Sequence, residues 1–513
     1  MSTDRDSEKQ VDGDVKLVTT AAAADDEAEL ARMGYKQELK RDLGLLQNFG
    51  VSFSIISVMT GIPTLFLFGL NTGGPAVMTL AWLVVSFFTM MVGLAMAEVC
   101  SSTPTSGGPY FWSAKLAPAG HAAFASWITG WFNLLGQVAV TTGISYGCAN
   151  FLATAATIGT DFAPNAKNIL GIYAAVLVAQ GVHLLRHINN VSIVWHAVGT
   201  IAVIIAVLAA APKHQSAKWV FTQFIDGTGG WGDRASHAYV MFIGILMAQY
   251  TLTGFDASAH MTEETHNAAV SGSWGIVMSI GDFDTTVASE SGQPVLQIFL
   301  DTMGRDGAIV CMVIVIGCMF WCGTFSITSN SRMMYAFSRD GALPGSKFFH
   351  RVDEKRKSPI RTVWLACTLS FILALPSLGN SVAFAAATSI ATIGLYVSYG
   401  IPILLRVIYS KKFEKGPWHL GAFSIPISII AVVWICFIAI LFMLPQVNPV
   451  TSETLNYAPV AVGIVMVYSL GLWLISGRKW FKGPIQQIAA EERGIDVMEP
   501  GALERAEREG KLQ

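Results

Sequence analysis

The sequence predicts an all-α protein that crosses a membrane many times, and three observations support this fold class. Only 13% of the 513 residues are charged, whereas a soluble globular chain carries roughly 25%. Long runs contain no charge at all, and the first extends from Phe49 to Ala97. Alternating strand patterns are absent, and helices satisfy their own backbone amides without water. We therefore expect a polytopic helical bundle.

Eleven segments are long and apolar enough to be spans, since a helix that crosses the hydrocarbon core needs about 20 apolar residues. The turn NTGGPA at 71–76 divides the first charge-free run into two of them. The predicted spans are 49–70, 77–97, 122–150, 169–185, 190–211, 238–258, 307–329, 360–376, 381–405, 424–444 and 458–476.

Lys and Arg in the short loops predict the orientation, because cytoplasmic loops carry an excess of these residues. The segment at 332–361 holds eight of them and the segment at 406–415 holds four, whereas the turns at 71–76 and 377–380 hold none. Both termini are therefore expected in the cytosol. The plasma membrane, the Golgi membrane and a mitochondrial membrane are the alternatives for its location.

Two tails are expected to flank a membrane domain at 41–480. Residues 1–30 hold nine acidic side chains and no apolar core, which indicates a disordered cytosolic tail at 1–40 rather than a targeting peptide. A second cytosolic tail is expected at 481–513.

Several function classes are excluded by composition and motif content. The net charge of -2 offers no basic field for nucleic acid, and no phosphate-binding GxxxxGK[ST] motif is present. Cys318 and Cys322 stand one helical turn apart, but no His or carboxylate lies near them in sequence, so packing is favoured over metal binding. We expect no metal, no cofactor and no enzymatic chemistry.

Two of the predicted spans carry residues that interrupt a helix. The first has Gly61 and Pro63 near its middle, where proline removes a backbone hydrogen bond and glycine accepts unusual dihedral angles. The sixth has Thr253 and Gly254 inside an apolar run. Paired interruptions are typical of inverted-repeat transporters, whose opened helices leave backbone groups free to hold a zwitterionic solute. A kink without function is the alternative.

Asp256 follows the interruption of the sixth span. An intramembrane carboxylate is costly and usually faces a pathway or a partner. We expect it to attract a substrate amine or to exchange a proton, and the alternative is a structural N-cap of the second half-helix. Glu263 and Glu264, further along, are expected at the cytosolic surface.

Three other polar side chains are candidates for proton or ion coupling. His196 lies in the fifth span, where a histidine can load and release a proton near neutral pH, and an interfacial packed histidine is the alternative. Ser326 and Ser329 lie in the span at 307–329. They can line a site for an ion or solute, or bond back to their own helix.

The most specific stretches of the sequence are GYKQELKRDL (34–43), MAEVCSSTPTSGGPYFWSAKLAP (96–118), AQYTLTGFDASAHMTEET (248–265), TSNSRMMYAFSRDGALP (328–344) and TLNYAPVAV (454–462). Together they resemble the amino acid, polyamine and organocation (APC) superfamily of permeases, and within it the branch of fungal GABA and choline permeases and plant bidirectional amino acid transporters. The resemblance covers nearly all of 33–485 and is greatest for the plant amino acid and GABA permeases.

This resemblance implies a LeuT-like five-plus-five inverted repeat, with repeats at 45–211 and 238–407 and two extra helices at 424–476. It implies a gate-side segment at SGGPYFW (106–112) and substrate contacts at Ser57, Thr60, Gly61, Ile62, Thr253, Gly254, Phe255 and Asp256. The implied function is secondary transport of a small zwitterionic amino acid or GABA by alternating access. A choline or polyamine permease and a non-transporting nutrient receptor are the alternatives.

The seventh crossing is expected to be truncated. The predicted orientation requires a crossing between 265 and 306, yet this interval offers only WGIVMSI (274–280) before Asp282 and Asp284. Such a helix covers about 10 Å of a core of about 30 Å. A skipped exon or a faulty gene model is favoured over a natural eleven-span protein. The expected structure has a stub at 274–280, a gap in the bundle beside it, and residues 282–294 at membrane depth.

Overall fold

A computed structural model of the chain describes residues 26–31, 33, 35, 37–158, 160–181, 185–280, 294–379, 383–481 and 483–484. Over these residues the secondary structure is helical, with three isolated bridges and no strand. The predicted all-α class is confirmed for this part of the chain.

The helices of the first half follow the predicted spans, with one short helix between loops. They are α2 (Leu45–Ile55), α3 (Val58–Asn71), α4 (Gly74–Ser102), α5 (Pro109–Leu116), α6 (Ala119–Ala156), α7 (Ala166–Gly181) and α8 (Leu185–Ala210).

The helices after α8 alternate between short pieces and long spans. They are α9 (Ala217–Thr222), α10 (Trp231–Arg234), α11 (His237–Gly244), α12 (Leu246–Thr251), α13 (Ala257–His260), η1 (Thr262–Glu264), α14 (Ala268–Ile280), α15 (Pro294–Arg339), α16 (Ser346–Phe349), α17 (Ile360–Ala374), η2 (Leu375–Leu378), α18 (Ala383–Ile408), η3 (Ser410–Lys412), η4 (Gly421–Phe423), α19 (Ser424–Leu441), α20 (Ala458–Leu472), η5 (Trp473–Gly477) and α21 (Arg478–Trp480).

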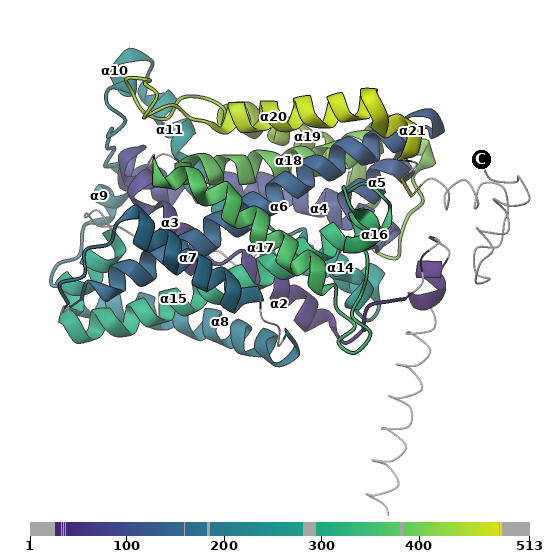
Figure 1. The fold of residues 1–513 in the computed structure, drawn as a ribbon. Helices are drawn as coiled ribbons and strands as arrows, with labels where there is room; N and C mark the ends of the chain where they lie inside the picture. Colours follow the sequence, from purple (N-terminus) through teal and green to yellow (C-terminus); the bar gives the residue numbers. More distant parts are fainter. Residues whose placement is uncertain are drawn as a thin grey trace, which may run out of the picture.

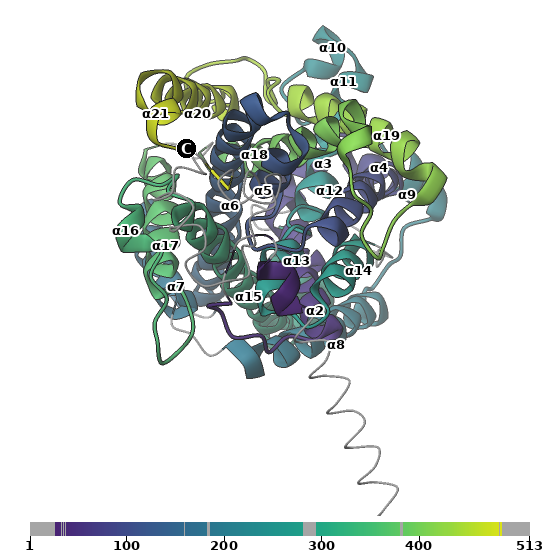
Figure 2. The ribbon, with the colours of Figure 1, turned by 90° about the vertical axis from the view of Figure 1, so that its right-hand side faces the viewer.

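The long helices form one bundle with two distinct ends. Figure 1 shows α16 and α21 at one end and α9 and α10 at the other. The end with α16 also carries the basic segments at 332–361 and 406–415, and we call it the basic end. Viewed along the bundle, α3, α12 and α13 lie inside a ring that includes α8, α17, α19 and α20 (Figure 2). Helix α6 contacts α5, α7, α15, α17 and α18, so it is the central scaffold.

The outer faces of the bundle are apolar, as expected for a protein solvated by lipid. Helix α8 exposes one such face, made by Val191, Val194, Val198, Ile201, Ile205 and Leu208. In the described part of the chain, eight helices are long and apolar enough to cross a membrane. They are Leu45–Asn71, Gly74–Ser102, Asn189–Ala210, Val295–Arg339, Ile360–Leu378, Ala386–Ile408, Gly421–Leu441 and Ala458–Trp480.

Three of the eleven predicted spans are not among these eight, for different reasons. Helix α6, predicted at 122–150, has 38 residues, but its apolar character is diluted by the buried polar residues Thr129, Asn133, Gln137, Thr141 and Ser145. Helix α7, predicted at 169–185, has only 16 residues. The span predicted at 238–258 is divided into α11, α12 and α13.

The predicted seventh crossing begins with a short helix. Helix α14 has 13 residues, about 20 Å of helix against a hydrocarbon core of about 30 Å. It starts at Ala268, six residues before the predicted stub at 274–280. Residues 281–293, which include most of the polar segment expected at membrane depth, lie outside the described residues. The next helix, α15, begins at Pro294 and is kinked at Gly304, where φ is 66°.

The first predicted tail, 1–40, ends earlier than expected. Residues 26–31 are helical, and Tyr35 and Leu39 are buried. The Asp26 carboxylate accepts hydrogen bonds from the backbone amides of Asn267 and Ala268 at the start of α14. Such contacts are invisible in a composition-based prediction, because they depend on a helix more than 200 residues away. We call residues 26–43 the N-terminal segment.

Candidate substrate-binding site

The first predicted span is divided into two helices. Helix α2 ends at Ile55 and α3 begins at Val58. Between them Ile56 and Ser57 leave the helical conformation, with ψ angles of 53° and 114°. Ser57 therefore stands directly before the first turn of α3, whose leading amides have no partner within their own helix.

The break was predicted at Gly61 and Pro63, and that position is wrong. Helix α3 continues through Gly61, and the proline is followed by a milder kink at Leu65, with φ of −108° and ψ of 17°. Gly61 has a different role, because a Cβ atom there would lie 2.1 Å from the Thr251 Oγ1 atom. The glycine therefore allows α3 to approach α12.

The sixth span opens at Thr253 and Gly254, as predicted. Helix α12 ends at Thr251 and α13 begins at Ala257. Gly254 adopts a φ angle of 107°, in a region that side chains disfavour and glycine tolerates. The local sequence therefore explains this break.

The two breaks lie against each other. A Cβ atom on Gly254 would lie 2.5 Å from the Cγ2 atom of Ile55. The Ser52 hydroxyl of α2 donates to the Phe255 carbonyl at 3.1 Å. The Ile55 carbonyl, freed by the first break, accepts a hydrogen bond from the Cys322 thiol of α15 at 3.2 Å. Each break is thus stabilised by groups distant in sequence.

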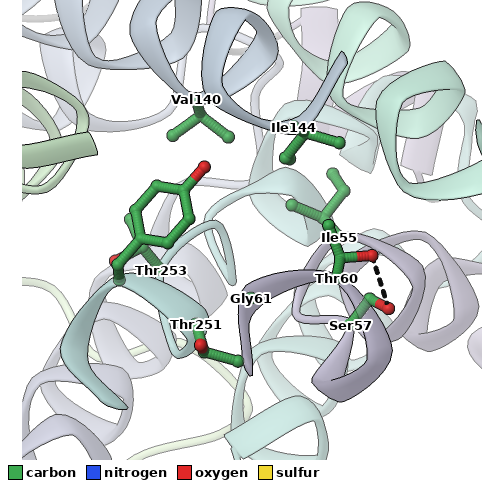
Figure 3. Close-up of a pocket in the computed structure, with 9 residues that line it drawn as sticks. Ile55, Ser57, Thr60, Gly61, Val140, Ile144, Thr251 and Thr253 are labelled. Carbon is green, nitrogen blue, oxygen red and sulfur yellow. Dashed lines mark hydrogen bonds between the residues drawn. The ribbon is translucent and has the colours of Figure 1, made fainter. Parts of the chain in front are cut away.

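A small cavity lies where the breaks meet (Figure 3). Its nine lining residues are Ile55, Ser57, Thr60, Gly61, Val140, Ile144, Tyr250, Thr251 and Thr253. All nine are buried, and none is charged. The Thr60 hydroxyl donates to Ser57 Oγ at 2.8 Å, while the buried Tyr250 hydroxyl has no partner. The cavity is therefore lined by buried hydroxyl, aliphatic and tyrosine side chains.

The structure brings half of the predicted substrate-binding residues to this cavity. Ser57, Thr60, Gly61 and Thr253 line it. Ile62, Gly254, Phe255 and Asp256 do not line it, although all four lie in the two broken spans. Phe255 is buried and its ring lies 5.2 Å from that of Tyr399 on α18, so it packs behind the break.

The Asp256 side chain, directly before α13, faces α6 and His260 at the end of α13. Its Oδ2 atom accepts a hydrogen bond from Gln137 Nε2 at 2.8 Å and lies 3.3 Å from His260 Nε2. Its side chain makes no capping hydrogen bond to α13, so the N-cap alternative is contradicted. Gln137 and the cavity-lining Val140 are three residues apart on α6, which places Asp256 about one helical turn from the cavity.

The other coupling candidates lie outside the cavity lining. His196 is buried on α8, with Nδ1 2.8 Å from the Ser192 carbonyl oxygen. Ser326 shares a hydrogen bond of 2.8 Å with the Thr141 hydroxyl of α6. Ser329 is buried with no partner for its hydroxyl.

The prediction that Glu263 lies at the surface is wrong, and Glu264 is only partly exposed. Glu263 is only 1% exposed. Its Oε1 atom lies 3.1 Å from Arg339 Nη2 and accepts a hydrogen bond from the Ser106 amide, also at 3.1 Å. Glu264 is paired with Arg332 at 2.7 Å. Both partners lie near the end of α15, more than 60 residues away, so local sequence could not indicate this burial.

A second cluster at the basic end joins the N-terminal segment to α5 and α15. The Tyr35 and Tyr110 hydroxyls donate to the Asp340 carboxylate at 2.9 and 2.8 Å. The Arg339 guanidinium lies 3.7 Å from the centroid of the Tyr35 ring. Burial, reinforced by the Asp340 charge, raises the pKa of Tyr35 well above its ordinary value, and burial also raises the pKa of Asp340. These contacts close the basic end.

Sequence reasoning missed five of the lining residues: Ile55, Val140, Ile144, Tyr250 and Thr251. It also missed Gln137 and His260 as partners of Asp256. One signal was available, because polar residues recur every fourth position along α6 in an otherwise apolar span, which places them on one helix face. That face meets Asp256 and Ser326.

A bundle of membrane-length helices with two breaks around a small buried cavity is typical of membrane transporters of small solutes. The chain belongs to the amino acid permease family, whose model matches residues 43–467. It is therefore an integral, multi-pass membrane protein, and the family consists of permeases rather than enzymes.

Similar proteins extend over nearly the whole chain. The amino-acid permease BAT1 homolog of Oryza sativa subsp. japonica is 45% identical, over 90% of this chain and 96% of its own. The amino-acid permease BAT1 of Arabidopsis thaliana is 42% identical, with the same coverage. The GABA-specific permease of Saccharomyces cerevisiae is 32% identical, over 95% of this chain and 91% of its own.

The alignment lengths show that these relatives carry additional residues inside the matched region. The alignment with the rice protein has 500 positions but covers 90% of 513 residues, about 462, so about 38 positions have no counterpart here. The same arithmetic gives about 39 for the Arabidopsis protein, whose alignment has 501 positions. A single spanning helix needs about 20 residues.

Proposed function

We propose that the chain is a secondary transporter that moves a small zwitterionic amino acid or GABA by alternating access. The observation that carries this proposal is the pair of helix ends at one cavity. Ser57, directly before α3, and Thr60 and Gly61 in its first turn contribute to the lining. The last turn of α12 contributes Tyr250 and Thr251.

These helix ends offer opposite partial charges to a zwitterion. The N-terminus of α3 presents unpaired amides and attracts a carboxylate, whereas the C-terminal end of the α11–α12 segment presents carbonyls and attracts an ammonium group. The lining side chains add hydroxyls but no charge. Backbone groups and hydroxyls carry only partial charges, so they can bind a net-neutral solute without holding it too tightly for release.

We assign direct substrate contacts to Ser57, Thr60, Gly61 and Thr253. Gly254 permits the break, and Ile62 and Phe255 pack around it. Asp256 is the proposed coupling group, because it is a buried carboxylate about one turn from the cavity. We rank it before His196, Ser326 and Ser329, which lie on α8 and α15.

The relatives support the choice of substrate class, since two are named amino-acid permeases and one is named a GABA-specific permease. We further propose the five-plus-five repeat at 45–211 and 238–407, with the extra helices at 424–476. Both termini are assigned to the cytosol, on the side of the basic end, by the positive-inside rule.

Uptake by purified protein in liposomes tests this proposal. A panel of labelled neutral amino acids, GABA, choline and a polyamine is offered, and we expect saturable uptake of an amino acid or GABA. Uptake of choline or polyamine alone would contradict the assignment, and so would binding without uptake.

A hydroxyl deletion tests the site itself. Ser57→Ala removes a donor at the α3 N-terminus, and a hydrogen bond to a charged group is worth about 1.5–3 kcal/mol, so KM should rise by roughly tenfold or more. Thr368→Val is the matched control, because that exposed hydroxyl on α17 bonds only to its own helix at the Trp364 carbonyl. An unchanged KM for Ser57→Ala would contradict the assignment.

A further inference from the structure

Asp256, directly before α13, and His260, the last residue of α13, form a fully buried pair. Both side chains are 0% exposed, and Asp256 Oδ2 lies 3.3 Å from His260 Nε2. The Gln137 amide donates to the same oxygen, while Oδ1 has no hydrogen-bond partner. A protonated His260 would therefore compensate the charge of this buried carboxylate.

The other ring nitrogen of His260, Nδ1, indicates how many protons the pair holds. His260 Nδ1 lies 2.9 Å from the Ser106 carbonyl oxygen, and a carbonyl only accepts, so Nδ1 must carry a proton. Without a further proton, the Nε2 lone pair would face a carboxylate oxygen across 3.3 Å. Nε2 makes no hydrogen bond in this geometry, and an additional proton, on Nε2 or on Asp256, removes the repulsion between the two atoms.

Loss of that proton must break one of the two contacts of His260. With one N–H left, the ring either donates to Ser106 and presents a lone pair to Asp256, or donates to Asp256 and presents a lone pair to the Ser106 carbonyl. Electrostatic repulsion opposes each arrangement. The protonated pair avoids both repulsions.

Ser106 lies in the loop between α4 and α5, residues 103–108, which we call the 103–108 loop. The loop packs directly on the histidine, since a Cβ atom on Gly108 would lie 3.0 Å from His260 Cε1. The Ser106 amide donates to Glu263, which is paired with Arg339 of α15. One loop residue is therefore held through its carbonyl by His260 and through its amide by Glu263.

We propose that Asp256 and His260 form a proton-binding pair whose deprotonation releases the 103–108 loop and opens the basic end. This inference rests on the proposed transport function and names a proton as the coupled ion. His260 is a positioning residue that links Asp256, beside the cavity, to the loop. Among the described residues, the other ionisable groups around the pair are Tyr399 of α18, which approaches Asp256, and Glu263, which Arg339 neutralises.

Accessibility of the loop tests the proposal without any substrate. Thr105 is buried, and Thr105→Cys places a thiol where only an open basic end exposes it. The background carries Cys436→Ser, which removes the exposed native thiol. Maleimide labelling of the full-length protein in liposomes is measured at about pH 5 and about pH 8, the range in which histidine titrates. Each rate is divided by that of unfolded protein at the same pH, which removes the ionisation of the thiol itself.

We expect the corrected labelling to be at least about fivefold faster at the higher pH, a typical coupling. His260→Gln and Asp256→Asn should each abolish this pH dependence, and either one suffices if the other does not fold. His350→Gln is the matched control, because His350 Nδ1 also lies against a main-chain carbonyl, that of Ser346, at 2.7 Å. It should retain the full pH dependence.

Labelling that does not change with pH in the Thr105→Cys protein would overturn the proposal, and so would a full pH dependence that survives His260→Gln. Failure of the proposed substrate assignment is distinguishable. In that case the uptake panel shows no amino acid or GABA transport, while the labelling still depends on pH and on His260.

Discussion

The cavity and the basic end of this permease solve different physical problems. The cavity is lined by hydroxyl, aliphatic and tyrosine side chains with no charge. The basic end holds two carboxylate–arginine pairs, Glu263 with Arg339 and Glu264 with Arg332, and a buried aspartate between two tyrosines. The two regions are close in sequence, since Thr253 of the cavity precedes Glu263 of the basic end by only ten residues.

The difference indicates a division of labour. A site that binds and releases a net-neutral solute gains from dipoles and hydroxyls, because a fully charged pocket would bind too tightly or demand a charged partner. A gate gains from buried ion pairs, because they are strong when complete and costly when one partner leaves. The predictions below test whether the two regions are as distinct as their chemistry.

The largest expected effect is at the cavity. Gly61→Leu should abolish uptake while the protein remains folded, because even a Cβ atom would lie 2.1 Å from Thr251 Oγ1 and force α3 away from α12. Uptake and size-exclusion profiles check this. Gly171→Leu on α7 is the control, since nothing lies within 4 Å of a Cβ atom there. Normal transport by Gly61→Leu would show that close approach of the breaks is unnecessary.

The next expected effect concerns the predicted seventh crossing, which begins with α14 and precedes α15 in the chain. We expect the full transcript to carry an insertion of some tens of apolar residues near residue 281, in line with the about 38 additional positions of the rice relative. The longer chain should then transport faster than this one. Transcript sequencing decides the origin. A transcript that encodes this chain without interruption, together with normal uptake by its product, would refute the truncation.

At the basic end the expected effect is on stability. Arg339→Met leaves the buried Glu263 without its partner, and such a loss costs about 3–5 kcal/mol. Thermal unfolding should show a lower Tm, and adding Glu263→Gln should recover much of it. Lys40→Met is the control, because the pair of Lys40 with Asp42 is exposed and worth less than about 1 kcal/mol. Equal Tm values for the two single variants would remove the distinction drawn between buried and exposed pairs.

The smallest expected effect is that of an epitope inserted in the segment at 345–357, because this insertion should leave transport unchanged. If the basic end is cytosolic, antibody reaches this epitope only after the membrane is permeabilised. Labelling of intact cells would invert the topology, and the proton-releasing side would then face outward.

Local chemistry explains which features were predictable. Low charge content and long apolar runs were enough for a helical membrane bundle, and the apolar outer face of α8 follows from them. The break at Gly254 was also predictable, since a residue at φ of 107° favours glycine whatever surrounds it.

The first break shows the limit of that reasoning. Gly61 and Pro63 are the local helix breakers, yet the chain opens at Ile56 and Ser57. Neither residue disfavours a helix strongly. The opening is stabilised instead by the Cys322 thiol on the freed Ile55 carbonyl, a contact that only the packing of α15 against α2 provides.

The sequence by itself therefore determined that the protein lies in lipid, its fold class, its family and the helix break at Gly254. These features depend on composition, periodicity and the conformational preference of single residues. Only the tertiary structure decided where the first span opens, that Glu263 is buried, and that His260 connects Asp256 to Ser106. Glu263 is separated from Arg339 by 76 residues and His260 from Ser106 by 154. Partners at such distances in sequence meet only when the packed helices bring them together, and no local pattern specifies that arrangement.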